Sequence, residues 1–143
     1  LPSGPTLIDT QANIWFFIGL IEGLVRSKID LTKIPFEKLK DDFYSVAKTG
    51  LNTEFHEPIH AQKVSLKQWI LNDGLTLTKA GLDSFGIDDV EAYMNIIEQR
   101  TSNEQNGASW QLEHYKKFNS IPKLMEDYMK NSELNIPVHT WSL

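Results

Sequence analysis

The chain has 143 residues, a size typical of one domain that buries its own core without disulfides or metal. Hydrophobic residues make up 41% and charged residues 23%, an ordinary globular composition that excludes a disordered chain. The formal net charge of −5 argues against nucleic acid as a partner, and the lack of cysteine excludes disulfides and zinc–thiolate sites. We therefore expect a single domain over residues 1–143, located in the cytoplasm because nothing marks an oxidising compartment.

The most apolar stretch, residues 12–25, predicts a first helix that begins near Asp9 or Thr10, either of which can serve as its cap, and runs to about Arg26. A membrane span needs about 20 apolar residues, and a signal peptide needs a basic flank before its apolar run. Neither condition is met, because Glu22 interrupts the run and no basic residue precedes it. We expect no membrane segment and a helix buried on most of its circumference.

The same predicted helix carries Gly19 and Gly23, four residues apart and therefore on one face. Glycine allows two backbones to approach closely because it has no Cβ atom. We expect these two glycines to pack against another element and to have no part in ligand binding.

A second helix is predicted from Pro35, which suits a first helical turn, to a stop at Gly50. Its apolar residues recur at helical spacing and form one stripe: Phe36, Leu39, Phe43, Val46 and Ala47. Polar and apolar residues then alternate, which favours a short hairpin with strands at about 52–56 and 59–63. Pro58 restricts its own position to a turn or an edge.

Ser65 is the predicted cap of a third helix, which runs to Gly86 and is kinked at residues 72–74. Its apolar residues cover two neighbouring faces, so we expect broad burial. The residues concerned are Leu66, Trp69, Ile70, Leu71, Leu75, Leu77, Ala80, Leu82 and Phe85. A fourth helix is predicted from a capping box, with Asp88 as the cap and Glu91 reaching back, and runs to about Arg100.

Two further helices are predicted, one from near Asn106 and one from Ser120 with Pro122 in its first turn. In the last helix the residues expected to be buried are Leu124, Met125, Tyr128 and Met129. The tail is too apolar to be free, so Val138 and Trp141 should dock on the core. The predicted fold is mainly α, with five or six helices and one short β-hairpin near residues 52–63.

Few patterns in the sequence indicate chemistry. His56 and His60, with Glu54 or Glu57, resemble a two-histidine–one-carboxylate set, but Pro58 separates the histidines in an extended segment. We therefore expect no metal site. The sequence has no glycine-rich phosphate loop, no GxSxG nucleophile motif and no HExxH zinc motif.

One junction remains of interest, RTSNEQNGASWQ at residues 100–111. A helix start offers unpaired backbone N–H groups, and Arg100 just before it adds a forked donor, so Arg100 with Asn106 and Gly107 could bind an anion. The alternative is structural: Arg100 complements the dipole of its own helix, Asn106 caps the next one, and Trp110 belongs to the core. The residues alone favour the structural interpretation without excluding the anion site.

Five stretches of the chain, in order, resemble the glutamate–cysteine ligase family 2, the bacterial ATP-dependent carboxylate–amine ligases. LPSGPTLIDTQANIWFFIGLIEGLV is similar to the family's "PTGPTVVDxVANxAFxxGL", and FEKLKDDFYSVAKTGLNT to its "ENFYRAARxGLD". DGLTLTKAGLDSFGID resembles "LLPLAREGLxxLGVD", and YMNIIEQRTSNEQNGASWQ resembles "YLGIIExRVxxGxTGAxWQ". The final IPVHTWSL is similar to a recurrent "PVHTWPL" ending.

The resemblance implies that the chain is the C-terminal helical part of a larger α+β ligase and is a fragment without activity of its own. Family members use ATP and magnesium to convert a carboxylate, typically the γ-carboxylate of glutamate, into an acyl phosphate that an amine then attacks. The nucleotide and metal ligands would lie on a sheet domain earlier in the same protein, so no cofactor is expected in this fragment. The helices would pack against that ATP-binding sheet.

Carried over by position, the arginine of "ExR" is Arg100, and "TGAxWQ" covers Asn106, Gly107, Ala108, Trp110 and Gln111. The "AARxGL" pattern places Lys48 where the family has arginine, which keeps the charge but loses the planar fork. The expected substrate-binding residues are Arg100, Asn106, Gly107, Lys48 and Gln111. Two other departures are Asp42 for the asparagine of "ENFY" and Glu104 for the first glycine of "GxTGA".

Two alternatives stay open at this point. The chain could be a stand-alone helical module that binds another protein, or a degenerate relative without catalytic activity. The ligase interpretation predicts a large uncovered apolar patch on the isolated chain, through which it would form a homodimer. A uniformly polar surface would favour the stand-alone module.

Overall fold

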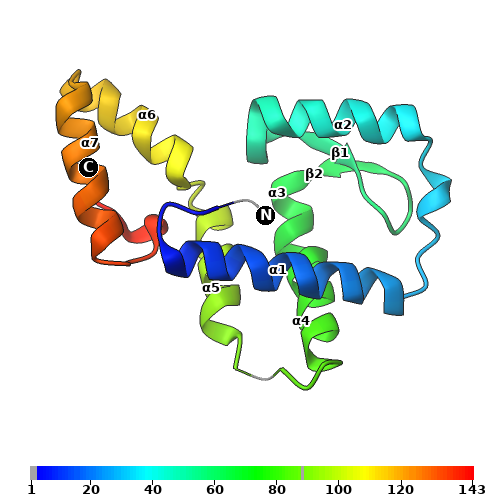
Figure 1. Cartoon of the computed structure of the whole chain (residues 1–143). Helices are drawn as coiled ribbons and strands as arrows, with labels where there is room; N and C mark the ends of the chain where they lie inside the picture. The colour runs from blue at the N-terminus through cyan, green and yellow to red at the C-terminus, as the bar shows by residue number, and fades with distance from the viewer. Residues whose placement is uncertain (1–2, 88) are drawn as a thin grey trace. The chain divides into compact units, whose positions relative to one another are not determined.

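The computed structural model describes residues 3–87 and 89–143. These residues form six helices and one two-stranded antiparallel sheet, which confirms the predicted mainly α fold (Figure 1). They divide into two compact units. Unit 1 comprises residues 3–17 and 89–143, and unit 2 comprises residues 18–87. The first helix, α1 (Leu7–Arg26), contributes to both.

Helix α1 begins two residues before the predicted start. Thr6 rather than Asp9 is its cap, because the Thr6 hydroxyl accepts the backbone N–H of Asp9 at 3.1 Å. The prediction that α1 is buried on most of its circumference is wrong. Its face with Ala12, Gly19 and Gly23 is buried, whereas the large apolar side chains opposite remain exposed: Phe17, Ile18, Ile21 and Val25. In the described chain, no helix is long and apolar enough to cross a membrane.

A 3-10 turn (Leu31–Lys33) leads to α2 (Phe36–Thr49). Pro35 is its N-cap rather than part of its first turn, and Gly50 follows its last residue, as predicted. Gly50 adopts a φ of 57° and donates its N–H to the carbonyl of Val46, ending the helix. None of the residues of α2 is buried, so its apolar stripe is less covered than its pattern suggests. Phe36 and Phe43 are 74% and 71% exposed.

The predicted hairpin is present, but its second strand lies later in the chain. After a short 3-10 turn (Gly50–Asn52), β1 (Glu54–His56) pairs with β2 (Lys63–Ser65), with Phe55 opposite Val64. The predicted strand at 59–63 is wrong because Glu57 organises that segment as a turn. Its carboxylate accepts the backbone N–H groups of Ile59, His60 and Gln62.

The predicted third helix is one continuous rod whose middle is distorted. It consists of α3 (Leu66–Trp69), a π-helical turn (Ile70–Gly74) and α4 (Leu75–Asp83). Ser65 caps it, as predicted, and the π turn lies over the residues 72–74 at which a kink was predicted. The buried residues include Trp69, Thr78, Gly81 and Leu82. Ala80 and Phe85 are exposed instead.

Within unit 2, α1 and α4 cross at glycines on both helices. A Cβ atom on Gly81 would lie 2.1 Å from the carbonyl oxygen of Gly19, and one on Gly23 would lie 2.1 Å from the carbonyl oxygen of Leu77. The predicted packing role of Gly19 and Gly23 is therefore confirmed, and Gly81 is their counterpart on α4.

In unit 1, α5 (Glu91–Ser102) follows Val90, which makes no side-chain cap bond, and the predicted cap Asp88 lies outside the described residues. Helix α6 (Gly107–Phe118) starts at a capping box formed by Asn106 and Ser109. Helix α7 (Ile121–Glu133) is capped by Ser120, with Pro122 in its first turn as predicted. A 3-10 turn (Val138–Thr140) ends the chain's ordered elements.

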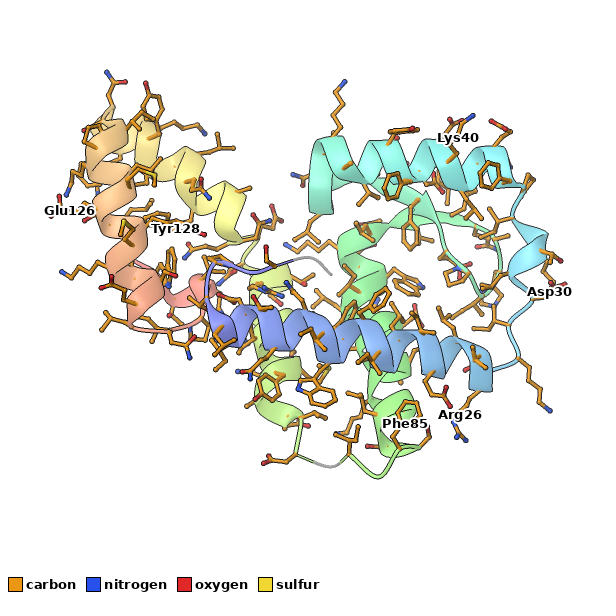
Figure 2. The ribbon with its side chains drawn as sticks, in the orientation of Figure 1. Arg26, Asp30, Lys40, Phe85, Glu126 and Tyr128 are labelled. Atoms are coloured by element: carbon orange, nitrogen blue, oxygen red, sulfur yellow. The ribbon has the colours of Figure 1, made fainter. Side chains whose placement is uncertain are left out.

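The core of unit 1 is an aromatic cluster between α6, α7 and the tail. Trp110 packs edge-on against Trp141 at a centroid distance of 5.0 Å, and Tyr128, labelled in Figure 2, packs against Trp141 at 5.4 Å. Val138 and Trp141 are buried, which confirms the predicted docking of the tail. Leu124 is also buried, but the prediction for Met125 and Met129 is wrong, because both lie on the outer side of α7 and are more than half exposed.

Candidate functional site

Asp9 is the centre of a buried polar network in unit 1. Its side chain is fully buried, and such a carboxylate requires partners. One oxygen, Oδ2, accepts the Thr6 hydroxyl at 2.7 Å and the backbone N–H of Val138 at 3.1 Å. The other oxygen, Oδ1, lies 3.4 Å from Nη1 of Arg100. Asp9 therefore joins the start of α1, the end of α5 and the C-terminal tail.

The second partner of Arg100 comes from the same face of α1. Its Nη2 donates to the side-chain oxygen of Asn13 at 2.6 Å, and the arginine side chain is only 13% exposed. Burial lowers the pKa of Arg100, and the negative charge of Asp9 opposes that shift. Arginine remains charged at neutral pH, so Asp9 and Asn13 hold a fixed guanidinium cation that presents further N–H donors.

His139 adds a titratable group to this network. Burial lowers its pKa, with Asp9 acting in the opposite direction and Arg100 in the same direction. Its Nδ1 atom is buried and has no hydrogen-bond partner within the described part of the chain. The neutral imidazole is therefore the favoured form beside the Asp9–Arg100 pair.

The loop before α6 holds the tail in place. Gln105 donates from Nε2 to the carbonyl oxygens of Val138 at 2.8 Å and Trp141 at 2.9 Å. Asn103 donates more weakly to the carbonyl of His139, at 3.4 Å. The RTSNEQNG junction thus fixes the tail, whose Val138 amide reaches Asp9.

Asn106 and Gly107 have structural tasks at the start of α6. The Asn106 side chain accepts the backbone N–H groups of Ala108 and Ser109, at 2.9 and 3.0 Å. A Cβ atom on Gly107 would lie 2.8 Å from Cγ of Pro5, so only glycine fits under that ring. The structural interpretation is confirmed for Asn106 as cap and for Trp110 as core, and the cap satisfies two N–H groups that an anion would need.

The five residues predicted to bind substrate are divided between the two units. Arg100, Asn106, Gly107 and Gln111 belong to unit 1, whereas Lys48 is an exposed residue of α2 in unit 2. Gln111 is exposed on α6. Among the described residues, no hydrogen bond joins Arg100 to Asn106, Gly107 or Gln111. The structure instead connects Arg100 to Asp9 and Asn13.

Sequence reasoning treated Asp9 only as a helix cap and did not identify Asn13 or His139 as neighbours of Arg100. A signal for two of them was present, since Asp9 and Asn13 both match fixed letters of the "DxVAN" pattern in the first resembling stretch. His139 likewise stands in the resembling "PVHTW" ending.

His56 and His60 of the hairpin region interact with two different carboxylates, Asp42 and Glu57. Asp42 accepts both the backbone N–H and the ring Nδ1 of His56 at 2.8 Å, whereas His60 is 70% exposed and its N–H goes to Glu57. Burial raises the pKa of Glu57, but three backbone N–H donors outweigh it and the net shift is downward. Over residues 3–87 and 89–143, no group of three or more acidic or histidine side chains is arranged to hold a metal ion.

Comparison of the chain with protein-family models, curated proteins and solved structures finds no significant match.

Proposed function

We propose that this chain is the helical C-terminal part of an ATP-dependent carboxylate–amine ligase of the glutamate–cysteine ligase type. The observation that carries the proposal is the network around Asp9. Asp9 and Asn13, Arg100 and Val138 come from three separate stretches that resemble the family, and their side chains and backbone meet in one hydrogen-bonded group. Residues that a protein family uses together are expected to meet in the fold even when they lie far apart in the sequence.

The proposed role of this network is to hold an anionic group. Asp9 and Asn13 use one donor of each terminal nitrogen of Arg100, and a guanidinium has five N–H donors in total. The remaining donors suit a substrate carboxylate or a phosphoryl oxygen. Asp9 and Asn13 would keep the guanidinium oriented, since a group positioned in advance loses less entropy when it binds.

The exposed apolar side of α1 supports the same proposal. Phe17, Ile18, Ile21 and Val25 form a continuous stripe opposite the buried glycines. A stripe of this kind indicates a missing covering surface. In the proposal this surface is an upstream sheet domain of the same protein, which would bring ATP and magnesium. The fragment alone would then be inactive, and the location would be the cytoplasm, where ATP is available.

The test uses the full-length protein encoded by the reading frame that contains this chain. Glutamate- and amine-dependent ADP release is measured for the parent and for Arg100→Lys and Arg100→Ala. Both variants should raise the KM for the acid or lower kcat, with kcat/KM reduced by roughly 100-fold or more, as for loss of a charged donor. Arg26→Ala is the matched control, because Arg26 is an exposed arginine of α1 that pairs only with Glu22 in the described chain, and it should stay within about twofold.

Two results would contradict the proposal. One is parent-like kinetics in a folded Arg100→Ala protein. The other is a folded full-length protein that releases no ADP with any amino acid and amine, which would favour the degenerate, non-catalytic relative. The isolated chain discriminates the ligase proposal from a stand-alone module. In the ligase proposal its α1 stripe should bind a hydrophobic dye or form a homodimer, and Ile21→Glu should abolish this. A compact monomer that binds no dye would favour the module.

A further inference from the structure

Unit 2 contains an open cavity of about 410 Å³ that the proposed ligase role does not use. Its walls come from the second half of α1, the segment before α2, α2 itself, the hairpin and Trp69. Apart from two residues, every residue that lines it is apolar, and Leu24, Ile34, Val46 and Phe55 are typical members. Cavities of this size and character are those that bind small molecules.

The two polar residues of the cavity form a single pair, Asp42 with His56. Both side chains are largely buried, at 14% and 18% exposure. One carboxylate oxygen of Asp42 accepts the backbone N–H of His56 and also its ring Nδ1. The backbone bond fixes the carboxylate, and the carboxylate in turn fixes the ring.

This arrangement determines which nitrogen of His56 carries the proton. An ionised carboxylate only accepts hydrogen bonds, so Nδ1 must be the donor. The neutral imidazole then has its lone pair on Nε2. Within the described part of the chain, Nε2 of His56 makes no hydrogen bond, so this lining residue offers a ligand an acceptor of defined identity. Trp69, which also lines the cavity, has a buried indole N–H without a partner in the same part of the chain.

We propose that this cavity binds a small apolar alcohol or phenol whose hydroxyl group donates a hydrogen bond to Nε2 of His56. The apolar walls would cover the hydrocarbon part, and removing this surface from water supplies most of the affinity. The hydroxyl supplies selectivity, because a ligand without a donor leaves Nε2 unpaired in an apolar site. An anionic ligand is disfavoured by the charge of Asp42 and by the apolar walls.

The test compares 4-propylphenol with its methyl ether, 4-propylanisole, which has the same apolar part but no donor. Binding to the ¹⁵N-labelled 143-residue chain is followed by amide chemical shifts of cavity residues. The phenol should bind at least about fivefold more tightly than the ether, the effect of one hydrogen bond. His56→Ala and the bulkier His56→Phe should both remove this preference.

Two further variants define the site. His60→Ala removes the exposed histidine of the adjacent turn and should leave both affinities unchanged. Val46→Trp should fill the cavity and weaken both probes by more than tenfold. Equal affinities of the two probes, a preference that survives in either folded His56 variant, or no binding to the folded parent would each overturn the inference. None of these outcomes depends on whether the chain belongs to a ligase.

Discussion

The crossing of α1 and α4 in unit 2 gives a prediction of defined sign and size for Gly81→Ala. A Cβ atom at this position would lie 2.1 Å from the carbonyl oxygen of Gly19 and 2.7 Å from the amide nitrogen of Gly23. Both contacts are to backbone, so no side-chain rotation relieves them. Two non-bonded heavy atoms need a separation of about 3.5 Å, so the two helix backbones must move apart by roughly 1 Å or more.

Two opposing effects set the magnitude. Alanine is favoured over glycine inside a helix by about 1 kcal/mol, which would stabilise the variant. Insertion of an extra carbon into a tightly packed contact costs about 1–3 kcal/mol, and a backbone clash lies at the upper end of that range. We therefore expect Gly81→Ala to lower the free energy of unfolding by about 2 kcal/mol, despite the better helix propensity.

The assay is urea denaturation followed by circular dichroism, with Ala80→Gly as the neighbouring control. Ala80 is exposed on the same helix, so its replacement should cost only the propensity difference of about 1 kcal/mol. If only helix propensity mattered, Gly81→Ala would raise the free energy of unfolding and Ala80→Gly would lower it. A Gly81→Ala protein as stable as the parent, or more stable, would refute the reasoning about this crossing.

Three other predictions concern unit 1. Asp9→Ala leaves the buried guanidinium of Arg100 without its carboxylate, so the free energy of unfolding should fall by about 3–5 kcal/mol in urea denaturation; a loss below about 1 kcal/mol would contradict this. The folded chain binds a proton at His139 less readily than the unfolded chain, so the contribution of His139 to stability is complete above its unfolded pKa of 6.5 and is lost as the pH falls below it. The melting temperature measured from pH 8 to pH 5.5 should therefore drop less in His139→Gln than in the parent, and identical slopes would exclude this role. Asn106→Ala removes the α6 cap and should cost about 1 kcal/mol, whereas Asn106→Asp, which keeps the acceptor, should be nearly neutral in thermal denaturation.

Local chemistry explains which parts of the fold could be predicted from the sequence. The caps at Asn106, Ser120 and Ser65 were identified because a cap bonds to N–H groups two or three residues away. The second strand of the hairpin was misplaced because the carboxylate of Glu57 gathers three backbone N–H groups, a choice that strand alternation does not reveal. The spacing of apolar residues likewise identified α2 as a helix, but it did not reveal that none of the helix's residues is buried.

The sequence by itself determined where most helices lie, the caps at Ser65, Asn106 and Ser120, and the glycines that allow close packing, because each depends on residues within a few positions of one another. Only the tertiary structure decided the surroundings of Arg100. Its partner Asp9 lies 91 residues earlier in the chain, and nothing in either local segment specifies that contact. A buried carboxylate and a buried guanidinium must find each other because neither can be desolvated alone, and which two meet is fixed by the packing of α1, α5 and the tail.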